Sequence, residues 1–475
     1  MSRGLLARYP CARITRADSI LRLAVATAAL AALFPAGCSN SQTPPSNESH
    51  AASGDTATHR ADAKLPPLVG VTNGPRVSWS MTGGTLVKVD SRTFRPLPGP
   101  RIELGFHGYS WSYSPDRSKL VVGGFASGVR FVDLDRFRHI GDLRENRRGG
   151  LVHAVAWPTP RRVLAIVQEP WGSGPLMLAT VDPQKRTVLS WRTVSRRATV
   201  VRAVANRLGL LLLLGPPRGI GPTKLLFVDV QGTARTVVLS RVRAGQESTP
   251  PSPTGRVVRW WRPDLTLDHA GKRAFVVGGG APVAEVDLRS MSVTYHELRE
   301  PISFLDRFRD WLAPAAHAKG ETEGPTRYAH WLSHGVLAVS GFDARGMTPS
   351  KARGLKLIDT RTWMTRTLDR SAGDFDSTPR LLLTYSCCFG SSESRGLTAY
   401  DTAGRVRWRL FGRTPIHAVQ VRGGRAYVQL PGTWSARGVL VAIVDLSRGK
   451  VLRTVRSPWT QLLLPGQTSM AEKEA

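Results

Sequence analysis

Cysteine and histidine side chains can bind metal ions, and cysteine can also act as a nucleophile. His330 and His334 stand four residues apart, but their segment resembles a strand followed by a turn, so the two rings need not share a face. No histidine spacing comes with a second ligand motif, and the sequence has no CxxC pair of the kind that holds zinc. We therefore predict no metal site and no catalytic residue. The cysteines that remain to be explained are Cys11, Cys38, Cys387 and Cys388.

Other motifs with known chemistry are equally sparse. The sequence contains neither GxSxG nor HExxH, the signatures of a nucleophile elbow and of a zinc protease. The run Gly278-Gly279-Gly280 follows an expected strand, but no helix or Walker lysine comes after it, so it predicts a loop and no phosphate cradle.

Arginine and tryptophan alternate in two segments, as they do where proteins stack bases and clamp phosphates. These segments are RVVRWWRPD, residues 256–264, and RVRWRLFGR, residues 405–413. Strands alternate in the same way for packing reasons. We favour exposed arginines beside half-buried tryptophans, and nucleic acid is not an expected partner.

The amino terminus predicts export. Its first 22 residues carry five arginines and one acidic residue, Asp18, and an uncharged apolar run then leads to Cys38. This run is too short for a comfortable transmembrane helix, and small residues precede the cysteine, as in a cleaved signal peptide. We predict a signal peptide over residues 1–37.

The segment Leu33-Phe34-Pro35-Ala36-Gly37-Cys38 resembles the lipobox of bacterial lipoproteins. That resemblance implies that Cys38 is diacylated, becomes the first residue of the mature chain and anchors it to the outer face of the bacterial cell membrane. Pro35 departs from the aliphatic residue that is usual there. The alternative is an ordinary secretory signal in which Cys38 is incidental. Residues 38–70, rich in Ser, Thr, Ala, Asn and Pro, predict a disordered tether.

An aspartate repeat organises the rest of the chain. An apolar strand ends in Asp, and a polar turn and a second strand follow. The separations are 42 to 49 residues, apart from two gaps of 58 and 72, which is the period of a four-stranded propeller blade. We expect these carboxylates to accept backbone hydrogen bonds in the turn between the third and fourth strands of each blade. They are Asp90, Asp133, Asp182, Asp229, Asp287, Asp359, Asp401 and Asp445.

The repeat predicts an all-β propeller over residues 71–466, with eight blades favoured over seven, followed by a flexible tail at 467–475. The first unit lacks an innermost strand, since RVSWSM, TLVKVD and RTFRPL supply only three. WTQLLLP, residues 459–465, could supply it and close the ring, which removes open sheet edges. The two long gaps hold insertions at 241–256 and 306–326, expected to be loops on one rim, with a short helix at 304–311.

Two resemblances support this fold. Trp111 to Leu120, WSYSPDRSKL, looks like the hairpin of TolB-like and related WD-type propellers, although Arg117 stands where Gly is usual. VDLSRGKVLRTV, residues 444–455, is similar to the YVTN-type and quinoprotein-like repeat. Propellers of these families are protein-binding platforms or, in some cases, enzymes, so the resemblance implies a fold and leaves the activity open.

The enzyme alternative comes from TAYDTAGRVRWRLFG. Through Asp401, Gly404 and Trp408 it resembles the tryptophan-docking repeat of pyrroloquinoline quinone dehydrogenases, some of which carry a disulfide between adjacent cysteines. Cys387 and Cys388 would be that pair, and an exported compartment permits the bond. A disulfide or two buried thiols without any cofactor is the favoured reading, because the pattern occurs convincingly in one unit alone. We expect no cofactor.

The formal net charge of +31 would suit an anionic partner. Most of these residues are arginines scattered along the chain, which a GC-rich genome would also produce. The sequence thus predicts a lipid-anchored propeller that acts as a binding or scaffolding module, with an envelope protein or an anionic polymer as its partner. An envelope oxidoreductase or lyase on the same ring is the alternative.

Overall fold

The computed structural model describes residues 68–463, apart from the segments 74–83, 91–94, 105–107, 125–127, 144–149, 169–173, 249–257, 299–321, 333–334, 346–347, 386–395 and 431–438 and the single residues 379, 423 and 458. All of these described residues belong to one compact unit, Ala63–Ala475. Within them, no helix is long and apolar enough to span a membrane. The predicted signal peptide, the four cysteines, His334, the short helix at 304–311 and the tail at 467–475 lie outside the described residues.

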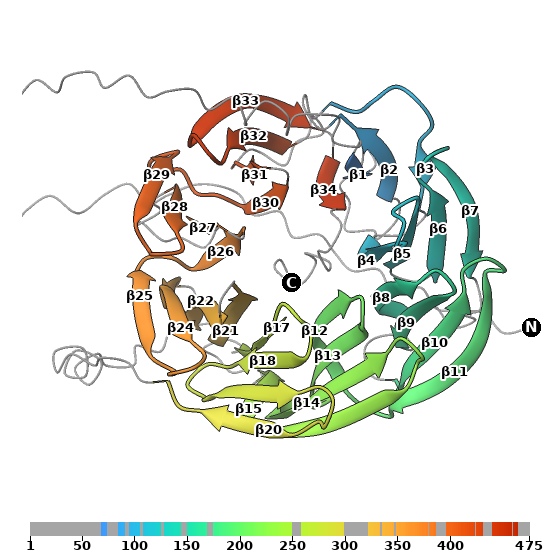
Figure 1. Cartoon of the computed structure of the whole chain (residues 1–475), viewed down its shortest axis with the longest axis horizontal. Coiled ribbons are helices and arrows are strands. Elements are labelled where there is room, and N and C mark those ends of the chain that lie inside the picture. Colours follow the sequence, from blue (N-terminus) through green and yellow to red (C-terminus); the bar gives the residue numbers. More distant parts are fainter. Residues whose placement is uncertain are drawn as a thin grey trace, which may run out of the picture. The chain divides into compact units, whose positions relative to one another are not determined.

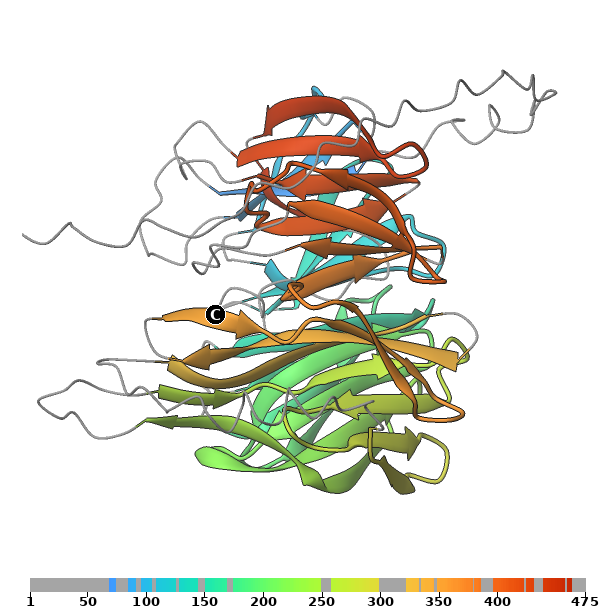
Figure 2. The same ribbon diagram turned by 90° about the vertical axis from the view of Figure 1, so that its left-hand side faces the viewer.

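The chain folds into eight four-stranded antiparallel blades arranged in a ring, so the predicted all-β propeller and its blade number are confirmed (Figure 1). Each blade is a meander whose strands run between two rims of the ring (Figure 2). Turns that join first to second and third to fourth strands lie on one rim, and the remaining connections lie on the other. From the axis outward, blades 1 to 4 contain β34 (Trp459–Leu463), β1 (Leu68–Asn73), β2 (Gly84–Val89) and β3 (Ile102–Glu103); β4 (Gly108–Tyr113), β5 (Lys119–Gly124), β6 (Val129–Asp133) and β7 (Arg138–Leu143); β8 (Leu151–Thr159), β9 (Arg162–Gln168), β10 (Leu176–Asp182) and β11 (Thr187–Ser195); and β12 (Thr199–Asn206), β13 (Gly209–Gly215), β14 (Gly219–Asp229) and β15 (Ala234–Ser248).

The second half of the ring repeats this plan and adds two strands. The added strands are β16 (Val258–Trp261), which continues from β15, and β23 (Thr348–Ala352), which pairs with β22. Blades 5 to 8 contain β17 (Asp264–Leu267), β18 (Arg273–Val277), β19 (Val283–Asp287) and β20 (Val293–His296); β21 (Thr322–Trp331), β22 (Val336–Arg345), β24 (Leu355–Asp359) and β25 (Thr365–Asp369); β26 (Asp374–Ser377), β27 (Leu381–Tyr385), β28 (Leu397–Asp401) and β29 (Val406–Leu410); and β30 (Ala418–Arg422), β31 (Arg425–Gln429), β32 (Val439–Asp445) and β33 (Lys450–Ser457).

The last strand closes the ring, as predicted. β34 pairs antiparallel with β1 and supplies the innermost strand of blade 1. Two details of blade 1 differ from the prediction. Its second strand is β1, which begins at Leu68, ahead of the expected start at residue 71, and its outermost strand is Ile102–Glu103 in place of RTFRPL. RVSWSM falls outside the described residues.

The core is divided into eight clusters, each of which lies between two neighbouring blades. Alternation along a strand sends successive side chains to opposite faces of its blade. In β5, Leu120 and Val122 pack toward blade 1, whereas Val121 packs toward blade 3. Both faces of a blade are therefore buried, which explains why the inner strands are almost continuously apolar.

The repeated aspartates stand at the end of the third strand of each blade, or directly after it in the case of Asp90. Where the turn that follows is described, the carboxylate accepts backbone N–H bonds within it. Asp182 Oδ1, for example, accepts from Gln184 N at 2.8 Å and from Lys185 N at 3.0 Å. Asp359 Oδ1 accepts from Arg361 N at 2.8 Å. The rim that carries these turns is called the aspartate-turn rim below.

These bonds make the turns sensitive to acid. Backbone hydrogen bonds hold the pKa of Asp182, Asp287, Asp359 and Asp401 below the ordinary value of 3.8. A carboxyl whose folded-state pKa is depressed stabilises the fold above its unfolded pKa and loses that contribution as the pH falls through the folded value.

We therefore expect the free energy of unfolding to decrease as the pH drops below about 4. Changing these four residues to Asn keeps an oxygen acceptor and removes the titration, so the variant should show a shallower pH dependence in urea unfolding at pH 6 and pH 3. Asp135→Asn is the control, because its exposed carboxylate accepts no hydrogen bond from the described residues. An unchanged slope in the fourfold variant would contradict this explanation.

The described part of the first insertion, residues 241–248, forms a strand where a loop was expected. β15 continues to Ser248, and β16 pairs with its end in antiparallel register, Gly245 opposite Trp261. β16 then pairs in parallel with the start of β21. The sheet of blade 4 thus joins that of blade 6 past blade 5. We call β16 and its pairing segments the strap, and the rim that carries it the insertion rim.

Candidate partner-binding groove

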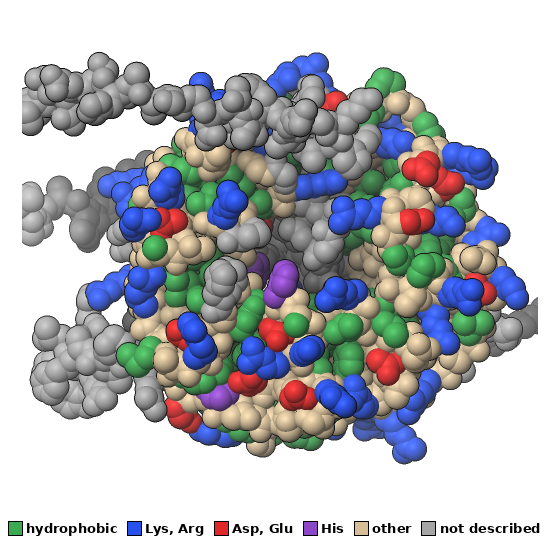
Figure 3. All heavy atoms as spheres, in the orientation of Figure 1, with side chains coloured by type: hydrophobic (Ala, Val, Ile, Leu, Met, Phe, Trp, Pro, Cys, Tyr) green, Lys and Arg blue, Asp and Glu red, His purple; other side chains and the backbone are tan. Residues whose placement is uncertain are grey.

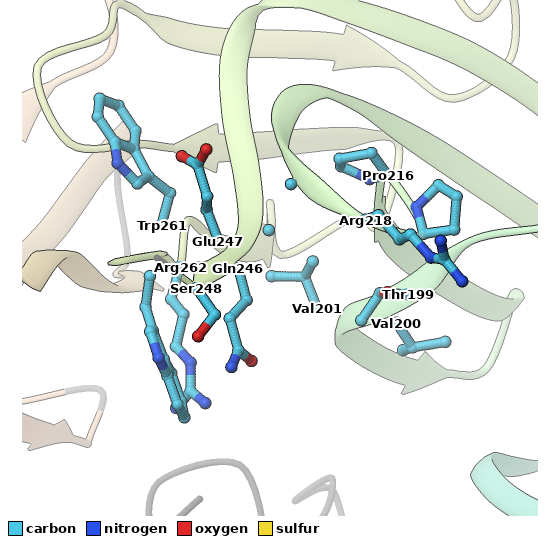
Figure 4. A pocket seen from close by; sticks show the side chains of 14 residues that line it. Thr199, Val200, Val201, Pro216, Arg218, Gln246, Glu247, Ser248, Trp261 and Arg262 are labelled. Atoms are coloured by element: carbon cyan, nitrogen blue, oxygen red, sulfur yellow. The ribbon is translucent and has the colours of Figure 1, made fainter. Parts of the chain in front are cut away.

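A hollow of about 830 Å³ lies beside the strap on the insertion rim (Figure 4). One wall is the hairpin of β15 and β16, and the other is formed by the start of β12 and the connection between β13 and β14. The lining residues are Thr199, Val200, Val201, Pro216, Pro217, Arg218, Gly219, Gly245, Gln246, Glu247, Ser248, Trp260, Trp261 and Arg262.

Glycines allow the two walls to meet. Gly219 and Gly245 both have positive φ, +71° and +123°, a region that other residues avoid. A Cβ on Gly245 would lie 2.2 Å from the Gly219 carbonyl oxygen. The close approach of β15 to the start of β14, and with it the shape of the groove, therefore requires glycine at residue 245.

The strap presents different side chains on its two sides. Figure 4 shows Glu247 and Trp261 on one side of the hairpin and Gln246, Ser248 and Arg262 on the other, as strand alternation requires. Arg218, Gln246 and Glu247 are exposed. The groove thus offers charged, amide and hydroxyl groups next to indole rings.

Arg262 is held in place by both its side chain and its backbone. Its guanidinium lies 3.7 Å from the ring centroid of Trp260, a cation–π contact. Its backbone N–H donates to the Pro325 oxygen at 2.9 Å, and its own carbonyl accepts from Arg327 N at 2.9 Å. Trp260 and Trp261 are half-buried and Arg259 is exposed, the arrangement that the sequence favoured for this segment.

The glycine run at residues 278–280 lies beneath the start of β21, which pairs with the strap. Residues 278–280 lie between β18 and β19 of blade 5, on the insertion rim. A Cβ on Gly279 would lie 2.2 Å from Pro325 Cβ, whereas a Cβ on Gly280 would meet nothing within 4 Å. Gly279 is therefore needed because the start of β21 passes directly over it.

We expect Gly279→Ala to lower the stability of the fold by about 1–3 kcal/mol, the range for overpacking a close contact. Gly280→Asn is the matched control, since its φ of +65° is tolerated by Asn and its surroundings are open. Thermal unfolding of the two variants measures the difference. Equal melting temperatures would show that Pro325 moves aside without cost.

The innermost strands are linked by side chains that accept backbone N–H bonds from the next blade. In two blades the acceptors stand two residues apart on the first strand. In blade 2, Ser110 Oγ accepts from Val155 N at 2.8 Å and Ser112 Oγ accepts from Trp157 N at 2.9 Å. In blade 5, Asp264 Oδ2 accepts from Ala329 N at 2.8 Å and Thr266 Oγ1 accepts from Trp331 N at 3.1 Å. Asp264 also lies 2.9 Å from Arg202 Nε of blade 4, so one carboxylate connects blades 4, 5 and 6.

The residues that suggested an oxidoreductase hold blades together. Trp408 Nε1 donates to the Leu446 oxygen of blade 8 at 3.0 Å, and a Cβ on Gly449 would lie 2.2 Å from Trp408 Cγ. Asp401 accepts from Arg405 N at 2.9 Å within its turn. Gly404, with φ of +81°, lies under Leu368 of blade 6. Each of these contacts is a packing or turn contact.

Of the histidine pair, His330 alone lies in the described part of the chain. His330 Nδ1 lies 3.1 Å from Ser377 Oγ, and its ring packs on Phe375 at 4.8 Å between centroids. The described residues contain no group of three or more His, Cys, Asp or Glu arranged to hold a metal ion. Lys and Arg side chains stand over every sector of the ring on the face seen in Figure 3, with fewer Asp and Glu between them.

Comparison with known proteins defines the class as a β-propeller protein. No protein-family model matches the chain, and no curated protein matches it by sequence. Its structure is similar to that of dihydro-heme d1 dehydrogenase NirN in complex with DHE, over 84% of this chain and 74% of that chain, at 13% identity with a TM-score of 0.53. BamB from Moraxella catarrhalis matches over 74% of this chain and 91% of that chain, at 11% identity with a TM-score of 0.41. At this level of identity, the likeness to NirN shows the fold alone.

Proposed function

We propose that the chain is an exported, lipid-anchored β-propeller that binds a protein partner at the cell envelope through the groove beside the strap. The groove itself carries the proposal. It combines half-buried tryptophans, a stacked arginine and exposed polar groups, and Trp and Arg are the residue types that dominate the binding energy of protein interfaces. Both of its walls belong to a closed ring, so a partner would meet a surface that is already organised.

The anchor at Cys38 is the second part of this proposal, and it rests on the lipobox-like sequence. In a bacterial host, wild-type protein should incorporate labelled palmitate and sediment with membranes. Cys38→Ser should lose the label and appear in the soluble exported fraction. An unlabelled wild-type protein that behaves like Cys38→Ser would reject the anchor and leave the groove proposal untouched.

Site-specific photocrosslinking tests the groove. A photoreactive amino acid at Arg218 or Gln246 should give the same discrete protein adduct in cells. The same amino acid at Leu189 or Leu452, both exposed on outer strands, should not give that adduct. Trp261→Ala should weaken the adduct at residue 218 by about tenfold, the effect of removing an interface hot spot, whereas Leu452→Ala should leave it unchanged. Identical adducts from all four positions, or none from the groove, would overturn the proposal.

A further inference from the structure

Both ends of the propeller lie on the aspartate-turn rim. In β1, Leu68 pairs with Val89, the last residue of β2 before the Asp90 turn, and Val69 pairs with Leu463 at the end of β34. The chain therefore enters the ring at this rim and leaves it there. The groove beside the strap opens on the opposite rim, the insertion rim. It is built from a connection between second and third strands and from the start of a first strand, and these lie on that rim.

The aspartate-turn rim carries exposed basic residues in blades all round the ring. Its aspartates accept backbone hydrogen bonds within their own turns, as Asp182 and Asp359 show. Basic residues in these turns are exposed, and two of them, Arg361 and Arg405, also pair with the aspartate of their own turn. The turns between first and second strands add further basic residues, such as Arg161 and Arg207. Exposed examples in six blades are Arg117, Lys185, Lys272, Arg361, Arg405 and Arg448.

A hollow of about 540 Å³ lies between blades 2 and 3 on this rim. Its lining includes Lys119, Arg138 and Arg186 and no Asp or Glu; the other lining residues are His139, Ile140, Pro183 and Gln184. No ion pair joins any of these three cations to a residue that the structure describes. Three positive charges around one hollow attract an anionic group such as a phosphate.

The backbone positions the cations of this hollow. Arg138 begins β7 directly after Phe137, whose φ is +47°, and Arg186 itself has a φ of +59° in the turn after Asp182. A Cβ on Gly141 would lie 2.7 Å from Arg186 Cδ. The Arg186 side chain therefore lies across Gly141 of the neighbouring blade, where a larger residue would displace it.

We infer that the aspartate-turn rim is the membrane-facing surface of the propeller and binds anionic phospholipid headgroups, with the hollow lined by Lys119, Arg138 and Arg186 receiving a headgroup phosphate. This inference rests on the proposed lipid anchor, since the tether that begins at Cys38 joins the ring at this rim. A diacylated cysteine would hold the chain at the membrane, and a basic surface beside it would add electrostatic attraction to anionic headgroups. The groove would then face away from the bilayer, toward its partner.

Vesicle binding by the unlipidated body, residues 63–475, tests the inference. This unit contains every described strand and closes its own ring. Co-sedimentation would use vesicles of phosphatidylcholine alone and of phosphatidylcholine with phosphatidylglycerol. We expect binding to the phosphatidylglycerol vesicles, loss of that binding at high salt, and no binding to phosphatidylcholine.

The decisive comparison is between two triple variants that remove the same charge. Lys119→Gln, Arg138→Gln and Arg186→Gln together should weaken binding to phosphatidylglycerol vesicles by about tenfold or more. Arg197→Gln, Arg243→Gln and Arg413→Gln, exposed residues away from this rim, should change it by less than about twofold if location matters more than bulk charge. Circular dichroism would verify the fold of both.

Equal losses in the two triple variants, or no binding to phosphatidylglycerol vesicles by the wild-type body, would overturn the inference. Binding to polyphosphate-coated beads without binding to the vesicles would also overturn it, in favour of an anionic polymer. None of these three results affects crosslinking at Arg218, so failure of the membrane-facing rim is distinguishable from failure of the partner-binding groove.

Discussion

Deletion of residues 459–475 is expected to open the ring and lower the stability of the propeller by roughly 3–5 kcal/mol, at about 1 kcal/mol for each backbone hydrogen bond lost. β34 is the innermost strand of blade 1. It pairs with β1 from Val69 opposite Leu463 to Thr72 opposite Trp459. Without it, β1 would present an unpaired edge in a blade that is already short, since β3 has two residues. Unpaired edges also promote association between molecules.

Chemical unfolding and size-exclusion chromatography would measure both effects. The matched control is deletion of residues 467–475, the predicted tail, which removes chain without touching β34 and should leave stability and size unchanged. If the longer deletion were as stable and monomeric as the shorter one, closure through β34 would contribute little. If the shorter deletion were itself destabilised, the expected domain boundary at residue 466 would be misplaced.

The sequence predicts the ring well because its signal is periodic. Eight aspartates, most of them 42 to 49 residues apart, mark the ends of eight third strands, and each is required by the same local turn chemistry. Closure by residues 459–465 followed from counting strands in the first unit. Blade 1 was traced less well, because β1 and β3 lie where the alternation of apolar and polar residues is weak and pairing with neighbours decides the strand.

The strap and the groove could not be predicted from the sequence, for a different reason. β16 pairs with β21, more than sixty residues further along the chain, and no local pattern in RVVRWWRPD identifies a partner strand. The glycines carried a usable signal: Gly245 and Gly279 stand in or beside strands, where glycine often marks close approach of another backbone. Which backbone approaches depends on tertiary contacts that spacing alone does not encode.

The ion pair at the start of blade 5 should be the most sensitive single position in the ring. Asp264 is 4% exposed, and its two oxygens serve Arg202 of blade 4 and the Ala329 N–H of blade 6. Asp264→Ala would leave a largely buried guanidinium and a buried amide without this carboxylate. Removing one member of a buried pair typically costs about 3–5 kcal/mol, so we expect a loss of that order in urea unfolding.

Blade 2 provides the control for this position. Ser110 occupies the place equivalent to Asp264 and bonds to the next blade through a neutral hydroxyl. Asp264→Ser should therefore recover the bond to Ala329 and part of the stability, but not the attraction to Arg202. The double variant Asp264→Ala, Arg202→Met should be more stable than Asp264→Ala alone, because the buried positive charge is removed together with its partner. If Asp264→Ala cost no more than Asp135→Ala at the exposed rim, the carboxylate would not connect the three blades energetically, and packing between the apolar clusters alone would hold them together.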